Sequence, residues 1–299
     1  MAALVNPEKS LAGRPIQGGL RLPLPWLGTV PFLGYVALFL VLPAAIVVAG
    51  AFAGDHGPTL ANLAALTQPY IVQSFVNSVV LSAASASIGA VAGAVLAYAV
   101  ASGDPRGPVR RLVTAGCGVL SQFGGVTLAF AFIATIGGEG FITLWLQHHG
   151  INIYANGVWL YQLSGLTLVY AYFQIPLMVI VFLPALDSIR PQWREATASL
   201  GGASWHYWRY VAGPILAPAF LGCALLLFAN AFSAYATAAA LINQGGIIVP
   251  LQISNALSSE VGLAQANVAS ALALGMVLVV AAVTGLYTVL QRRTARWLP

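Results

Sequence analysis

Six long apolar runs dominate this sequence and limit what it can fold into. Each is long enough for the roughly 20 residues with which a helix crosses the hydrocarbon core of a bilayer. They lack the alternation of apolar and polar residues that marks a membrane β-barrel, so helices are the expected spanning form. We therefore predict an all-α membrane protein with six transmembrane helices. The runs lie near residues 30–53, 72–102, 112–136, 160–186, 214–242 and 264–290.

The composition agrees with this fold class. Of the 299 residues, 59% are hydrophobic and only 6% are charged, whereas about a quarter of a soluble domain is charged. We expect a tail over residues 1–29, one transmembrane domain over 30–290 and a second tail over 291–299. The apolar run after the first tail continues too long for a signal peptide, which predicts a retained first span.

The positions of the charges predict the orientation of the spans. If the N-terminus is cytoplasmic, all 12 Lys and Arg residues fall on the cytoplasmic side. The opposite loops then contain no basic residue, and their acidic residues are Asp55, Glu139 and Glu260. This segregation follows the positive-inside rule and places both termini in the cytoplasm. Topology thus explains the net positive charge, and we do not expect nucleic acid to bind. The basic residues are Lys9, Arg14, Arg21, Arg106, Arg110, Arg111, Arg190, Arg194, Arg209, Arg292, Arg293 and Arg296.

Small residues recur at every fourth position of the second run, at Ser85, Gly89, Gly93 and Ala97. This spacing lets helix backbones approach closely in a membrane. We favour packing within the chain, and an interface between subunits is the alternative.

Polar residues inside the spans are few and uncharged. The absence of Asp, Glu, Lys and Arg within the predicted spans argues against a proton-driven carrier, although neutral sites for sodium remain possible. Asn230 and Ser233 can share a helix face, and Tyr235 follows in the same run. We interpret this face as a possible translocation path; interhelical hydrogen bonding is the alternative.

The outer loops and cysteines give no catalytic or metal signature. His148 and His149 lack a carboxylate or thiol at ligand spacing, so we expect exposed histidines rather than a zinc site. Cys117 and Cys223 lie in apolar runs and imply no disulfide framework. The loop 243–263 reads as an irregular segment containing glycine.

The loop 187–213 combines charge, aromatic residues and a Gly-Gly break. Pro191 suits the first position of a helix, and Gly201-Gly202 should end or bend it. A second short helix would carry Ala203, Tyr207 and Val211 on one face until Gly213-Pro214 stops it. Such a bent pair of short amphipathic helices predicts a docking knob.

Part of this stretch resembles the EAA loop of binding-protein-dependent ABC importer permeases. Three positions depart from that pattern. The family has a small residue where this chain has Thr197, an alanine where it has Gly202 and a leucine where it has Gly213. The matching residues are Glu195, Ala196, Thr197, Leu200, Gly201, Gly202, Trp208, Val211, Pro214 and Pro218.

The resemblance implies a type I importer permease in the bacterial inner membrane. Its partners would be two ATPase subunits, a second permease (identical or related), an extracytoplasmic solute-binding protein and the bilayer. ATP and Mg would bind the ATPase subunits, because this chain lacks the G-x-x-x-x-G-K-[ST] phosphate-binding loop; we expect no cofactor, no metal and no enzymatic activity in it. The coupling residues would be Arg194, Glu195, Ala196, Thr197, Leu200, Gly201 and Gly202.

The substrate is less constrained by the sequence. The fifth run and the loop after it resemble permeases of the spermidine/putrescine group, which makes a polyamine the expected solute. Phosphonate, iron and sugar are the alternatives within the family. Outside it, the alternatives are an ion-coupled secondary carrier and a structural membrane subunit.

Overall fold

The structure is a computed structural model that describes residues 24–54, 57–155, 157–242, 248–258 and 263–294. The predictions made for residues 1–23, Asp55, Glu260 and residues 295–299 therefore lie outside the described residues. The chain divides into two units, residues 1–46 and 47–299, and each is described by itself.

The first unit is helical wherever the structure describes it. It contains α1 (Leu24–Val36), a π-helical turn (Ala37–Val41) and the first part of α2 (Leu42–Ala51). The apolar stretch Thr29–Ala51 is long enough to cross a membrane, and its most apolar window has no residue buried inside the protein. Phe32, Phe39 and Leu40 are each more than 60% exposed. A bilayer would cover such a surface.

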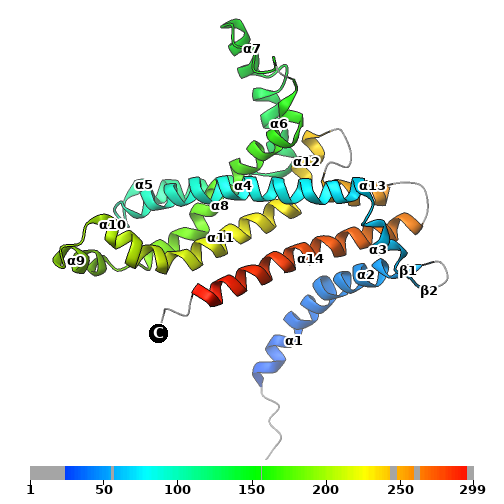
Figure 1. Ribbon diagram of the computed structural model, residues 1–299, viewed down its shortest axis with the longest axis horizontal. Coiled ribbons are helices and arrows are strands. Elements are labelled where there is room, and N and C mark those ends of the chain that lie inside the picture. Colours follow the sequence, from blue (N-terminus) through cyan, green and yellow to red (C-terminus); the bar gives the residue numbers. More distant parts are fainter. Residues whose placement is uncertain (1–23, 55–56, 156, 243–247, 259–262, 295–299) are drawn as a thin grey trace, which may run out of the picture. The chain divides into compact units, whose positions relative to one another are not determined.

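The second unit is built almost entirely from helices (Figure 1). A two-stranded hairpin, β1 (Ala53–Gly54) with β2 (Gly57–Pro58), is the one departure from the predicted all-α class among the described residues. The helices are α3 (Ala61–Ala65), α4 (Pro69–Ala101), α5 (Pro108–Gln122), α6 (Gly125–Ile136), α7 (Phe141–His148), α8 (Leu163–Asp187), α9 (Pro191–Ser199), α10 (Ser204–Tyr207), α11 (Gly213–Ser233), α12 (Ala236–Leu241), α13 (Val249–Ser258) and α14 (Leu263–Thr294).

Six helical stretches among the described residues are long and apolar enough to span a membrane, which confirms the predicted number. Two of the predicted segments were wrong in detail. The run 112–136 is broken at Phe123–Gly124 into α5 and α6, and the loop 243–263 contains α13 rather than only irregular backbone. The six stretches are Thr29–Ala51, Pro69–Ala101, Gly125–His148, Leu163–Asp187, Ser204–Ser233 and Ala266–Val289.

The core of the second unit forms where α4 packs along α8. The small-residue stripe of α4 is buried and faces α8, as the packing interpretation predicted. A Cβ atom added at Gly93 would lie 2.5 Å from the Cβ of Met178 and 2.7 Å from the carbonyl oxygen of Ile175. Only a glycine permits this approach, so the stripe packs within the chain.

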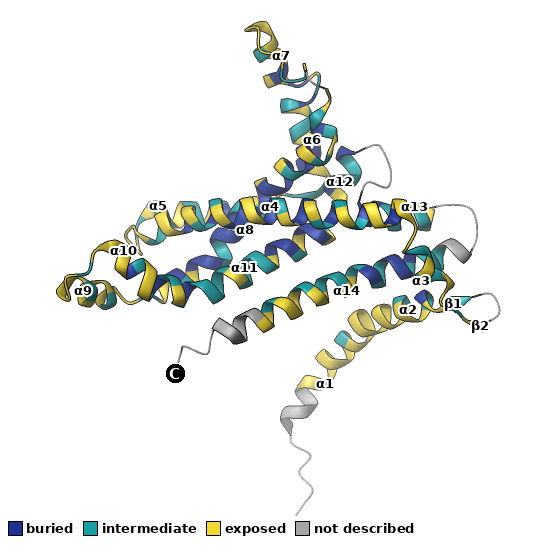
Figure 2. Cartoon of the chain, in the orientation of Figure 1, coloured by how far each residue is buried: buried dark blue, intermediate teal, exposed yellow. Residues whose placement is uncertain are grey.

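Helix α8 is the most buried of the six spanning stretches, with 61% of its most apolar window inside the protein (Figure 2). It packs against α4, α5 and α11. At its centre, the buried Gln174 donates a hydrogen bond from Nε2 to the hydroxyl of Ser85 on α4, at 2.9 Å. This polar contact joins α4 and α8 inside the core.

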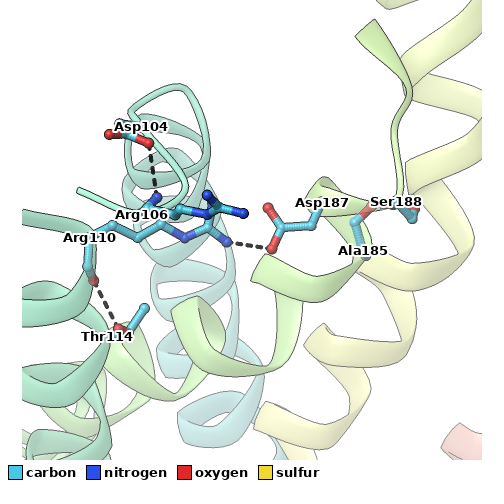
Figure 3. A network of polar contacts seen from close by, with 7 residues as sticks. All are labelled: Asp104, Arg106, Arg110, Thr114, Ala185, Asp187 and Ser188. Carbon is cyan, nitrogen blue, oxygen red and sulfur yellow. Dashed lines mark hydrogen bonds and ion pairs between the residues drawn. The ribbon is translucent and has the colours of Figure 1, made fainter.

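Helices α5 and α8 are also joined near one end of each. The Arg110 guanidinium forms an ion pair with the Asp187 carboxylate, and Figure 3 shows the two side chains pointing toward each other. Nearby, the Asp104 carboxylate accepts a hydrogen bond from the N–H of Arg106 at 2.9 Å. The pair ties the start of α5 to the residue that ends α8, four positions before α9 begins.

The chain after α9 corrects a sequence prediction. Gly213-Pro214 does not stop a short helix, because Ser204–Ser233 is one continuous helical stretch. A π-helical turn, Trp208–Ala212, precedes the proline, and the N–H of Gly213 bonds to the carbonyl of Trp208, five residues back. A π turn changes the hydrogen-bond register, and this lets the helix pass a residue that has no N–H to donate.

Candidate functional site

Helix α9 begins and ends as its sequence predicts. Pro191 occupies its first turn, and Arg190 before it is extended. After Ser199, the N–H of Gly201 bonds to the carbonyl of Ala198, and the N–H of Gly202 bonds to that of Thr197, both at 2.9 Å. Gly201 has a φ of +76°. This hydrogen-bond pair around a left-handed glycine is the Schellman arrangement, which caps the helix and reverses the chain.

Thr197 and Gly202 both depart from the EAA pattern, and the structure places these two residues next to each other. A Cβ atom at residue 202 would lie 2.8 Å from the Cγ2 of Thr197 and 2.9 Å from its carbonyl oxygen. The Thr197 hydroxyl is held by a 2.8 Å hydrogen bond to the carbonyl of Trp193. The Cγ2 of Thr197 and its backbone carbonyl oxygen together leave no room for a Cβ atom at residue 202, so glycine is required there.

The α9 turn and the helix after it expose apolar side chains. Leu200 is 89% exposed, and Trp205 and Tyr210 are each about two-thirds exposed (66% and 67%). Arg194, Glu195 and Ala196 are also exposed. Exposed large side chains of this kind, next to charged ones, mark a surface that a partner can cover. We call residues 191–210 the α9–α10 knob.

The Glu195 carboxylate makes no ion pair or hydrogen bond within the described part of the chain, where the ion pair formed is that of Arg110 with Asp187. Instead Glu195 and Arg194 both line a cavity of about 430 Å³ under the knob. The carboxylate is free to meet a group from outside the chain.

The predicted pathway residues Asn230, Ser233 and Tyr235 come together in a second place. All three line a pocket of about 300 Å³. This pocket lies at two breaks between helices. One break separates α5 from α6, and the other separates α11 from α12. Its lining is completed by Ser121, Gln122, Gly124, Gly125, Phe173, Ala234, Ala236 and Thr237.

Hydrogen bonds that involve side chains stabilise the backbone at the two helix breaks. The N–H of Gly125, at the start of α6, donates to the hydroxyl of the buried Thr237 on α12, at 2.9 Å. The Tyr170 hydroxyl on α8 donates to the carbonyl of Ala234 at 2.7 Å. Broken helices at membrane depth are tolerated where such partners satisfy the backbone or a cavity is lined.

The chemistry of this pocket is neutral. It offers amides from Gln122 and Asn230, hydroxyls from Ser121, Tyr235 and Thr237, and the ring of Phe173. Tyr235 shares a 2.9 Å hydrogen bond with Ser254 of α13, which connects the pocket to the segment after α12. Of the three predicted residues, Ser233 turns its hydroxyl to the backbone of its own helix, toward Ala229 and Asn230.

Sequence reasoning missed the contribution of α5, α6 and α12 to this pocket. Gly124-Gly125 was available as a signal of a break inside the third run, because paired glycines weaken a helix interior. Thr237 had no comparable signal, since its role depends on a partner 112 residues away.

No metal-binding cluster of three or more His, Cys, Asp or Glu side chains exists among the described residues. His148 and His149 have ring centroids 5.8 Å apart, and His149 also packs on Trp145. Within the part of the chain that the structure describes, no third ligand lies beside the two histidines.

No protein-family model matches the chain. Over 135 residues it is 29% identical to the thiamine transport system permease protein ThiP of Escherichia coli K12, and 28% identical to that of Salmonella typhimurium LT2. The match covers 44% of this chain and 24% of each relative, so the chain spans about a quarter of the length of the relatives it matches.

The solved structures extend the likeness to nearly the whole chain. A bacterial ABC transporter involved in the import of the acidic polysaccharide alginate aligns with a TM-score of 0.74 at 15% identity, over 90% of this chain and 95% of its own. The chain has the fold of an ABC importer permease. A structure of a bacterial alginate ABC transporter, in complex with a periplasmic protein bound to alginate pentasaccharide, aligns with a TM-score of 0.71 at 18% identity.

The ABC importer permease fold agrees with the resemblance found in residues 187–218. Six helical stretches among the described residues are long and apolar enough to span a bilayer, which indicates a multi-pass membrane protein. The α9–α10 knob and the pocket at the helix breaks are then two separate features of one permease fold.

Proposed function

We propose that this chain is a transmembrane permease subunit of an ATP-driven importer that receives a small polar solute from an extracytoplasmic binding protein. The chain would pair with a second permease and stand on two ATPase subunits in the bacterial inner membrane. The α9–α10 knob would be the coupling segment. The observation that carries this proposal is the Schellman-capped, exposed α9 bearing the EAA-like residues on a chain with the importer permease fold.

The free Glu195 carboxylate supports this assignment. An exposed acidic group without an internal partner is available for a charged or hydrogen-bonding group of an ATPase. Leu200, at the tip of the turn, supplies exposed apolar surface beside it. Ala196, Gly201 and Gly202 keep the turn narrow enough to seat in a groove.

The mechanism is a shift between inward-open and outward-open states. A ligand shifts such an equilibrium only if it binds one state better than the other. ATP bound to the ATPase pair would favour the outward-open state, and the loaded binding protein would favour that same state. The pocket at the helix breaks would lie on the path that the solute follows.

Coupling is tested by Glu195→Arg. We expect a P-loop ATPase to co-purify with the tagged wild-type chain from native membranes in mild detergent and to be depleted at least fivefold with the variant. Glu139→Arg makes the same change at an exposed residue of the α6–α7 connection and should retain the ATPase. Equal recovery with Glu195→Arg would remove the coupling assignment.

The solute is tested by uptake. A polyamine remains the finer prediction, and the similarity to thiamine permeases makes thiamine the second candidate. We expect ATP-dependent uptake of one of the two in membrane vesicles. Asn230→Leu should lower the uptake severalfold while the ATPase still co-purifies, because only the pocket has changed. Unchanged uptake would exclude Asn230 from the path, and uptake abolished by collapse of an ion gradient would favour a secondary carrier.

A further inference from the structure

Helix α5 connects the region next to the α9–α10 knob with the pocket at the helix breaks. In its first turn, Arg110 forms the ion pair with Asp187, the last residue of α8. In its last turn, Ser121 and Gln122 line the pocket. The 15 residues of α5 span roughly 22 Å at a rise of about 1.5 Å per residue. One helix therefore reaches from the ion pair to the pocket.

Neither charge of this ion pair stabilises the helix that carries it. Asp187 lies at the C-terminal end of α8, where the helix dipole disfavours a carboxylate. Arg110 lies in the first turn of α5, where the helix dipole disfavours a cation. Each charge is compensated by the other instead. The Arg110 side chain is only 16% exposed, and partial burial reduces the screening of the pair by salt.

The connection from α8 to α9 is short and internally hydrogen-bonded. The Ser188 hydroxyl donates to the carbonyl of Ala185 at 2.6 Å, beside Asp187 (Figure 3). The N–H of Ile189 donates to the carbonyl of Leu186 at 3.2 Å. Since these bonds hold the connection to the end of α8, a displacement of α9 also moves Asp187.

One face of α5 lies against α8. Val113 and Cys117 pack in the same apolar cluster as Phe182 of α8. Arg110 and Ser121 stand on the same face as these two α5 residues, because all four follow one another at steps of three or four positions. A single face of α5 thus has the ion pair at one end and a pocket residue at the other.

Helix α8 offers a second route to the pocket, because Phe173 also lines it. Pro176 and Pro184 lie inside α8, between Phe173 and Asp187. A proline inside a helix removes a backbone hydrogen bond and allows the helix to bend. The sequence of α5 contains no proline after its first position. Helix α5 is therefore the stiffer connection of the two.

The break after α5 separates its pocket end from α6. Phe123 leaves the helical conformation, with a ψ of 77°, and the N–H of Gly125 is held by Thr237 of α12. A shift of α5 would move Ser121 relative to the α6 and α12 side of the pocket. Rigid elements with two arrangements are the physical means by which distant sites are coupled.

We propose that α5 transmits the movement of α9 to the pocket, and that Arg110 and Asp187 are the positioning residues that connect α5 to α9. This inference rests on the proposed function, in which α9 couples to an ATPase and the pocket lies on the solute path. When the ATPase pair closes, α9 moves the end of α8, the ion pair moves the start of α5, and Ser121 shifts at the pocket. Neither charged residue has to touch the ATPase or the solute.

Thiol labelling at residue 121 tests the proposal in inverted membrane vesicles that contain the full chain and its native partners. The chain carries Cys117→Ala, Cys223→Ala and Ser121→Cys. We expect ATP with vanadate, which arrests an ATPase after hydrolysis, to change the rate of reaction with N-ethylmaleimide at least threefold. Adding Asp187→Asn should abolish this change while a P-loop ATPase still co-purifies, because α9 itself is unaltered.

Two further variants distinguish the ion pair from a general loss of folding. Arg110→Asp combined with Asp187→Arg rebuilds the pair and places each charge at the helix end that favours it, so the effect of nucleotide should return. Asp104→Asn makes the same change of carboxylate to amide in the exposed connection before α5. It leaves the pair intact and should keep the effect of nucleotide.

The possible outcomes separate this inference from the proposed function. An unchanged effect of nucleotide in Asp187→Asn would overturn the link through α5, and so would a chain with the pair intact that retains the ATPase but shows no effect at residue 121. Failure of the reversed pair to restore the effect would show that the pair has only a structural role. If no P-loop ATPase accompanies the wild-type chain, the proposed function fails and the link fails with it.

Discussion

At the residue scale, Thr197 and Gly202 act as a matched pair. Taken one at a time, each residue is a mismatch to the EAA pattern. In the structure the Cγ2 and the carbonyl oxygen of Thr197 both occupy space that a Cβ atom at residue 202 would need, so the glycine accommodates the threonine side chain as well as the turn. The sequence could suggest a helix and a glycine turn here, but not this accommodation, because contact between positions five apart across a turn depends on the Schellman geometry.

A double-mutant cycle tests the pair. Gly202→Ala should weaken the turn by about 1–3 kcal/mol, the usual cost of adding bulk to a packed site. Peptides spanning residues 193–206 should then exchange their amide hydrogens roughly 5- to 100-fold faster, because local opening becomes easier. Adding Thr197→Ser, which keeps the hydroxyl and removes Cγ2, should restore part of the protection; the carbonyl of Thr197 prevents full recovery. Effects that simply add would refute the pairing.

At the element scale, the breaks between helices define the candidate pathway. The sequence predicted six apolar runs and placed Asn230, Ser233 and Tyr235 on one path, and the structure gathers these three in one pocket. It did not predict that α5 and α6 are separate or that α12 follows a break. Hydropathy reports how apolar a run is, whereas the breaks are held by long-range hydrogen bonds such as that from Gly125 to Thr237. The predicted stop at Gly213-Pro214 failed for a related reason, since the π turn lets the helix continue.

Thr237→Val tests the bond between the breaks. The substitution keeps the shape of the side chain but leaves the Gly125 N–H without its acceptor, which costs about 1–3 kcal/mol. The apparent melting temperature in detergent should fall by roughly 2–10 °C, and uptake of the transported solute should fall with it. Thr237→Ser keeps the acceptor and should stay near the wild type in both measurements. If valine and serine behave alike, the hydrogen bond does not hold the breaks.

At the scale of the whole molecule, the segregation of basic residues makes a prediction about orientation that the fold leaves open. A variant without Cys117 and Cys223 would carry one new cysteine, either Ser188→Cys next to α9 or Ala155→Cys in the connection between α7 and α8. A membrane-impermeant maleimide added to intact spheroplasts should label Ala155→Cys and spare Ser188→Cys until the membrane is opened. The opposite labelling would invert the topology and place the α9–α10 knob outside, away from any cytoplasmic ATPase.

The π turn at Trp208–Ala212 has a consequence for the angular phase of the helix that carries it. A π turn holds one residue more than an α turn, and each residue advances a helix by about 100°. If Ser204–Ser233 were a regular α-helix, each side chain from Gly213 to Ser233 would lie on a particular face of it. The π turn rotates all of these side chains by about that angle away from that face. Asn230 lines the pocket at the helix breaks in this shifted phase. Deleting a single residue between 208 and 212 would turn the whole of α11 about its axis and present a different side chain to that pocket.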